Sequence, residues 1–173
     1  MPNPAQEDKD FQNIMKFTLM FEGGQVDDPQ DSGGRTNQGV TQVTYNRYRD
    51  VHKLIRRDVF VMTNLERDAI YRNQYWEFSD LTDGRDWPLN GVLFDISVLS
   101  GPGLGLHFID RAKREGTIAL TDPYRMQKLA ACCLRYRAQM FYNLVDARPK
   151  DARFLKGWLR RNASLARYTG VTL

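Results

Sequence analysis

Apolar residues recur every three or four positions along most of the chain, which is the period of an amphipathic α-helix. The first such stretch covers residues 8–22, and its apolar stripe consists of Phe11, Ile14, Met15, Thr18 and Leu19. Gly23-Gly24, directly after it, is a helix stop signal. Residues 25–40 lose the helical period and are rich in Asp, Pro, Gly, Ser and Asn. This composition predicts turns and a small β-hairpin after the first helix.

The helical period returns in six later segments. A helix is expected from Thr41 through Ile55. Thr63–Glu66 has the form of a capping box, which would open a helix that runs through Tyr75-Trp76. The remaining helices are expected over residues 88–101, 107–116, 122–145 and 151–168. The pattern therefore predicts a mainly α-helical protein with one small β element.

The length and composition suit one compact unit, because 173 residues with 42% apolar and 27% charged residues can bury a sizeable core. The glycine-rich segment Gly101–Gly105 is the weakest point of the helical pattern. It divides the chain into two expected regions, residues 8–100 and residues 101–173.

Charge is distributed unevenly between the front and the rear of the chain. Residues 1–110 hold 11 Lys/Arg and 17 Asp/Glu, a balance of −6, whereas residues 111–173 hold 14 and 4, a balance of +10. A basic rear favours an anionic partner such as nucleic acid, lipid headgroups or a charged cell-wall polymer, although solvated helix faces would give the same count. The arginines considered for such a contact are Arg135, Arg137, Arg160 and Arg161.

The sequence gives no indication of a membrane span, a signal peptide, a disulfide or a metal site. No apolar run approaches the roughly 20 residues that a membrane-spanning helix needs. The polar, acidic N-terminus is not a signal peptide. The adjacent Cys132 and Cys133 are predicted to be two buried thiols, because neighbouring residues are poorly placed for a disulfide. His52 and His107 are isolated, so neither a metal site nor a cofactor is expected.

The stretch FEGGQVDDPQDSGGRTNQGVT, from Phe21 onward, combines residues that could perform acid catalysis. Glu22 would lie on the apolar stripe at the end of the first helix, where a carboxyl group keeps its proton more readily and can act as a general acid. Asp31, in a polar turn, would stay ionised, and the Thr36 hydroxyl could orient water or that carboxylate. An acid facing a carboxylate is the arrangement that hydrolyses glycosidic bonds. Acidic residues in ordinary turns are the alternative interpretation.

The same stretch closely resembles the opening signature of glycoside hydrolase family 108, the N-acetylmuramidases of phages and Gram-negative bacteria. AIYRNQYWEF and LFDISVLSG resemble two later helices of that family, and YRAQMFYNLV and FLKGWLRR resemble the peptidoglycan-binding region that usually follows. The resemblance covers roughly residues 11–168 and implies a lysozyme-like α+β fold with a C-terminal helical bundle. Residues 8–100 would be the muramidase region and residues 101–173 the peptidoglycan-binding region.

The resemblance also implies roles for individual residues. Glu22 would be the catalytic acid, Asp31 the second carboxylate and Thr36 the third member of the site. Four residues separate Asp31 from Thr36, whereas phage lysozymes commonly have five, so Asn37 competes with Thr36.

A glycan cleft also needs aromatic platforms and polar contacts. The residues expected to bind substrate are Tyr45, Tyr75, Trp76 and Asn37, although aromatic residues at helical spacing are more often part of a core. Asp95 lies on an otherwise apolar helix and needs a buried partner, such as an arginine or a helix N-terminus.

These features predict an endolysin-type muramidase that cleaves the β-1,4 bond between N-acetylmuramic acid and N-acetylglucosamine. A lytic transglycosylase and a non-catalytic wall- or nucleic-acid-binding module are the alternatives. The expected partner of the basic rear is peptidoglycan rather than nucleic acid, with weak lipid contact through the last helix. A monomer is expected. The protein would be made in the host cytoplasm and would act in the periplasm after its release.

Overall fold

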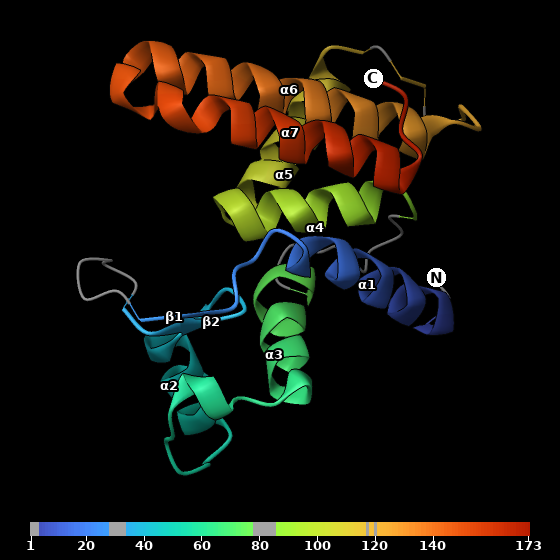
Figure 1. The fold of residues 1–173 in the computed structure, drawn as a ribbon. Helices are drawn as coiled ribbons and strands as arrows, with labels where there is room; N and C mark the ends of the chain where they lie inside the picture. Colours follow the sequence, from blue (N-terminus) through green and yellow to red (C-terminus); the bar gives the residue numbers. More distant parts are fainter. Residues whose placement is uncertain (1–3, 28–33, 78–85, 117, 120) are drawn as a thin grey trace.

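The structure is a computed structural model, and it describes residues 4–27, 34–77, 86–116, 118–119 and 121–173. The described residues form seven α-helices, three short helices of other types and one three-stranded sheet (Figure 1). The α-helices are α1 (Pro4–Leu19), α2 (Gln42–Val51), α3 (Asn64–Tyr71), α4 (Leu89–Ser100), α5 (Pro102–Arg114), α6 (Arg125–Ala147) and α7 (Ala152–Thr169). The short ones are the 3₁₀ helices η1 (Val59–Val61) and η3 (Pro149–Asp151) and the π-helix η2 (Arg72–Glu77).

A small sheet follows the first helix, as the sequence predicts. Strands β1 (Gln25–Val26), β2 (Thr36–Asn37) and β3 (Val40–Thr41) pair antiparallel in the order β1-β2-β3. The sheet therefore has one strand more than the predicted hairpin. Its short strands lie with α2 and α3 at one end of the molecule, away from α6 and α7 (Figure 1).

Helix α1 ends three residues before the predicted limit. The helix stops at Leu19, and Met20–Glu22 form a turn in which the Glu22 N–H still donates to the Thr18 carbonyl at 3.1 Å. The predicted stripe is correct, because Phe11, Ile14, Met15 and Thr18 are buried. Glu22 therefore begins the segment that leads from the helix into the sheet.

Local sequence signals set the boundaries of two helices beside the sheet. The Thr41 side chain accepts a hydrogen bond from the Thr44 N–H and caps α2. The predicted capping box at Thr63 and Glu66 is present at the start of α3. Because the Thr63 cap satisfies N–H groups that have no partner within the helix, it fixes where the helix begins.

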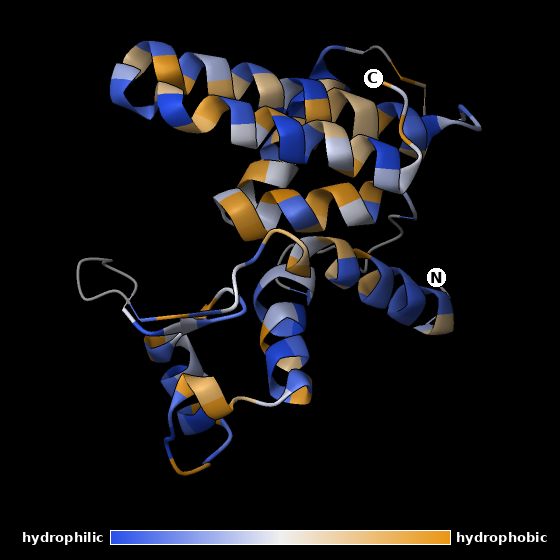
Figure 2. Ribbon diagram, viewed as in Figure 1, coloured by the Kyte–Doolittle hydropathy of each residue, from blue (hydrophilic) through white to orange (hydrophobic). Residues whose placement is uncertain are grey.

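Helix α4 occupies the centre of the core. It packs against α1, α5, α6 and α7, and the buried apolar residues form one cluster that runs from Phe11 to Val171. In Figure 2 this helix is largely orange, whereas α2 and α3 carry much blue. Gly101, with a φ of +88°, separates α4 from α5, but α5 already begins at Pro102, so the rest of the predicted break Gly101–Gly105 is helical. Cys132 and Cys133 are buried thiols in α6 and form no disulfide, as expected.

Helices α6 and α7 run alongside each other and form an antiparallel hairpin that covers α4 (Figure 1). In the part of the chain that the structure describes, no helix has the length and apolar character to cross a membrane.

Candidate functional site

Glu22 is partly buried and lies where α1, the sheet and α7 meet. Its side chain is 20% exposed, which leaves one part of the carboxylate accessible and the other in contact with protein. Oε1 accepts a hydrogen bond from Nη1 of Arg161 at 3.0 Å. The partner comes from α7, 139 positions further along the chain, and the sequence interpretation did not include it.

A chain of buried charges holds Arg161 in this position. Its Nε and Nη2 donate to Oδ1 of Asp95 on α4 at 3.1 and 2.8 Å. Oδ2 of Asp95 accepts from Nη1 of Arg137 on α6 at 2.8 Å, and both of these side chains are fully buried. Arg137 also donates to Oδ1 of Asn162 at 2.7 Å. The partner that Asp95 was predicted to need is therefore a pair of arginines.

The network balances charge in a buried place, because two carboxylates face two guanidinium groups. Buried ions are tolerated only when they are paired and hydrogen-bonded. Burial by itself lowers the pKa of Arg161, but Asp95 and Glu22 outweigh it and the net pKa is raised. Arg161 is thus a permanent cation beside Glu22.

The turn between β2 and β3 reaches the other side of Glu22. Gly39 has a φ of +77°, and a Cβ atom there would lie 3.0 Å from Oε2 of Glu22 and would collide with the Tyr71 hydroxyl. The Tyr71 hydroxyl donates to the Gln38 carbonyl at 3.0 Å. A glycine is therefore required at this position of the FEGGQVDDPQDSGGRTNQGVT stretch.

Two tyrosines complete the surroundings of Glu22. Burial, and then the charge of Glu22, raise the pKa of both Tyr71 on α3 and Tyr75 on η2. Both hydroxyl groups therefore stay neutral throughout the ordinary pH range and can serve as hydrogen-bond donors.

Of the other two predicted catalytic residues, the structure describes Thr36 but not Asp31. Asp31 lies outside the described residues, so its place relative to Glu22 stays a prediction. Thr36 is on β2 and partly exposed, and its hydroxyl donates to the Gly34 carbonyl at 3.1 Å. Asn37, the competing residue, is buried, and its amide donates to the Val59 carbonyl at 3.0 Å. That contact favours Thr36 over Asn37 as the accessible polar group.

The predicted aromatic platforms are mostly inside the protein. Tyr45 and Trp76 are both 0% exposed, so neither ring has a face open to a sugar. The Tyr45 hydroxyl is bonded to Glu66, and the Trp76 indole N–H donates to Glu7. Helical spacing is the same for core and cleft aromatics, which explains why the sequence could not separate them. Tyr75 alone of the three is partly exposed and near Glu22.

Of the four arginines predicted to contact an anionic partner, two are buried and two are exposed. Arg137 and Arg161 are buried in the network around Asp95, so the expectation that they face a polymer surface is wrong. Counting charge along a sequence treats every arginine as exposed, which fails for arginines paired inside the protein. Arg135 and Arg160 are exposed. Among the described residues, no group of acidic, histidine or cysteine side chains is arranged to hold a metal ion.

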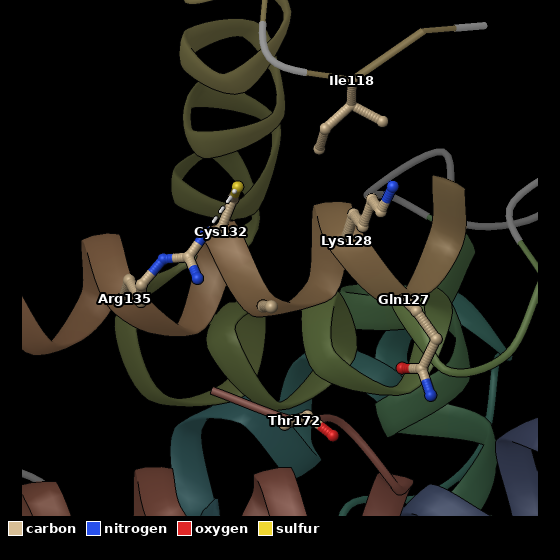
Figure 3. Close-up of a pocket in the computed structure, with 7 residues that line it drawn as sticks. Ile118, Gln127, Lys128, Cys132, Arg135 and Thr172 are labelled. Carbon is tan, nitrogen blue, oxygen red and sulfur yellow. Dashed lines mark hydrogen bonds between the residues drawn. The ribbon is translucent and has the colours of Figure 1, made fainter. Parts of the chain in front are cut away.

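Two concave regions lie near these helices. One, of about 360 Å³, is formed by residues of α6 together with Ile118 and Thr172 (Figure 3), and there Arg135 donates to Sγ of Cys132 at 3.2 Å. The other, of about 430 Å³, lies between the end of α1 and α7. Its lining includes the aromatic rings of Phe17, Phe21 and Tyr168 and the side chain of Arg167.

Comparisons with known proteins concern the family and the fold. The family model described as Glycosyl hydrolase 108 matches residues 15–101, a range that includes Glu22, Gly39, Tyr71 and Asp95. Among solved structures, SagA from Brucella abortus is similar at a TM-score of 0.63 and 22% identity, over 94% of this chain and 95% of that chain. At that identity the likeness concerns the fold. No curated protein matches the chain.

Proposed function

The chain belongs to the glycosyl hydrolase 108 family, and we propose that it hydrolyses peptidoglycan with Glu22 as the general acid. The bond cleaved is the β-1,4 linkage between N-acetylmuramic acid and N-acetylglucosamine. Glu22 protonates the glycosidic oxygen, and Asp31 stabilises the oxocarbenium-like state or positions water together with Thr36.

The placement of Glu22 carries the proposal. It is a partly exposed carboxylate that is held by an arginine on one side and approached by a glycine turn on the other. A general acid needs this combination, because it must reach the leaving oxygen and yet have a fixed position.

A glycan strand also needs contacts beside the reacting bond. The groove between the end of α1 and α7 offers the partly exposed rings of Tyr168 and of Phe21, which directly precedes Glu22, together with Arg167. We propose that these residues, with Tyr75, take the place of the buried Tyr45 and Trp76 as sugar contacts. Residues 101–173 would bind the same polymer through exposed cations such as Arg135 and Arg160.

The test is Glu22→Gln against the wild type on purified peptidoglycan, with product masses as the readout. The variant should keep its unfolding temperature and lose at least about 10²-fold in rate, because an amide cannot supply the proton. Glu115→Gln is the matched control, since this exposed glutamate also pairs with an arginine and lies on another part of the surface. A fully active Glu22→Gln protein would refute the assignment.

The product masses also decide between hydrolysis and transglycosylation. Hydrolysis of the muramyl bond leaves a reducing N-acetylmuramic acid end, which carries the mass of one added water. A 1,6-anhydro end, lighter by that water, would replace the muramidase proposal with a lytic transglycosylase.

A further inference from the structure

The guanidinium of Arg161 uses all of its nitrogen atoms to join two carboxylates. Nη1 bonds to Glu22, while Nε and Nη2 bond to Asp95. The rigid fork of an arginine can make these bonds at once, whereas the single ammonium of a lysine cannot. The position of the Glu22 carboxylate therefore depends on the position of Asp95.

Asp95 is itself fixed by packing and by a second cation. It is 0% exposed in the middle of α4, and Arg137 on α6 is bonded to its other oxygen. Asn162, one residue after Arg161 on α7, connects Arg137 to the Leu134 carbonyl of α6. Helices α4, α6 and α7 are thereby locked together at the point where Arg161 leaves the core towards Glu22.

We propose that Arg161 is a positioning residue for catalysis: anchored by Asp95 and Arg137, it fixes the orientation of the Glu22 carboxyl group towards the substrate. This inference rests on the proposed role of Glu22 as the acid. It assigns part of the catalytic machinery to the C-terminal region, which lies outside the matched family range.

The electrostatic surroundings make the role measurable. Three titratable groups of the described residues face Glu22, namely Arg161 from α7, Tyr71 from α3 and Tyr75 from η2. Both tyrosines are neutral in the assay range, so Arg161 supplies the charge that acts on Glu22, and Asp95 is the counter-charge behind it. Replacing Arg161 therefore removes the charged group that holds the Glu22 carboxyl group, and the effect is measured on kcat.

Arg161→Lys and Arg161→Gln test the proposal, and Arg56→Gln is the matched control, because Arg56 also pairs with an aspartate but is exposed and lies in the segment after α2. For Arg161→Lys we expect kcat to fall at least about 10-fold while KM stays within about twofold, because a lysine cannot hold both carboxylates. For Arg161→Gln we expect kcat to fall about 10²-fold, because no guanidinium group then joins Glu22 to Asp95. Arg56→Gln should leave kcat and KM unchanged.

A purely structural role for Arg161 predicts different results. It would lower the unfolding temperature while each folded molecule kept the wild-type kcat, and that outcome would overturn the proposal. Normal kcat in Arg161→Lys would overturn it as well. If Arg161→Gln does not fold, the split between kcat and KM in Arg161→Lys decides. An active Glu22→Gln enzyme would instead remove the proposed function on which the inference rests.

Discussion

At Gly39 the main chain has a φ of +77°, and the space where a side chain would begin is taken by Glu22 and Tyr71. The residue therefore has two separate reasons to be glycine. One is the left-handed backbone conformation, which costs other residues about 1–2 kcal/mol. The other is contact, because the turn must come this close for the sheet to border the carboxylate.

The two reasons can be separated by comparing two alanine substitutions. Gly116 also has a positive φ, +65°, but its Cβ would meet nothing within 4 Å. Gly116→Ala should cost about 1 kcal/mol of unfolding free energy and leave lysis unchanged. Gly39→Ala should cost about 1–3 kcal/mol more through overpacking and should lower kcat strongly, since Glu22 or Tyr71 must move. Urea unfolding and turbidity assays measure both; equal behaviour of the two variants would contradict the contact argument.

At the scale of elements, Glu66 connects α3 to its neighbours. Its carboxylate completes the capping box and also accepts hydrogen bonds from Tyr45 of α2 and from Arg57. Burial works against ionisation of Glu66, but hydrogen bonds from Thr63, Arg57 and Tyr45 outweigh it and lower its pKa to about 2. One carboxylate thus joins the helices that support the sheet.

This contact predicts a defined sensitivity to acid. The pKa of Glu66 is lower in the folded state than the ordinary 4.5, so its stabilisation is complete above about pH 4.5 and is lost as pH falls towards 2. Glu66→Gln should therefore lower the unfolding free energy by about 2 kcal/mol at pH 7, with the difference from wild type shrinking between pH 5 and 2. Thermal unfolding across this range provides the measurement. A difference that stays constant with pH would show that the ionised form is not what matters.

For the whole molecule, the basic residues 111–173 can still attract an anionic polymer, although two of their arginines are buried. Arg135 and Arg160 are exposed on the α6–α7 hairpin, which lies at the opposite end of the molecule from the sheet. Opposite charges attract a polyanionic polymer over about 8–10 Å at moderate salt, so this end would meet peptidoglycan first.

The corresponding prediction concerns salt. Lytic rate at low substrate should fall as NaCl rises, and the double variant Arg135→Gln/Arg160→Gln should show a lower rate at low salt and a flatter dependence. Arg47→Gln, which removes an exposed cation from α2, should retain the wild-type slope. Identical slopes for wild type and the double variant would mean that the hairpin does not guide encounter.

How well the sequence predicts a feature depends on the distance along the chain between the residues that form it. Helix positions and the cap at Thr63 depend on neighbours a few residues away. The sequence predicted the cap and each α-helix, with several helix ends displaced by a few residues. The contacts of Glu22 with Arg161 and Gly39 depend on tertiary packing, and no local period encodes them. The prediction that Tyr45 and Trp76 bind sugar missed their burial for a related reason. Aromatic residues of a core have the same helical spacing as aromatic residues of a cleft.

The Glu22–Arg161 contact has a consequence for the time at which the enzyme becomes complete. Translation must continue for 139 residues after Glu22 before Arg161 exists. At about 5–20 residues per second, this interval lasts about 7–28 seconds. If Arg161 positions the acid, a nascent chain on the ribosome and any fragment released early would be unable to cut a glycan, so the cell producing it is exposed only to finished molecules.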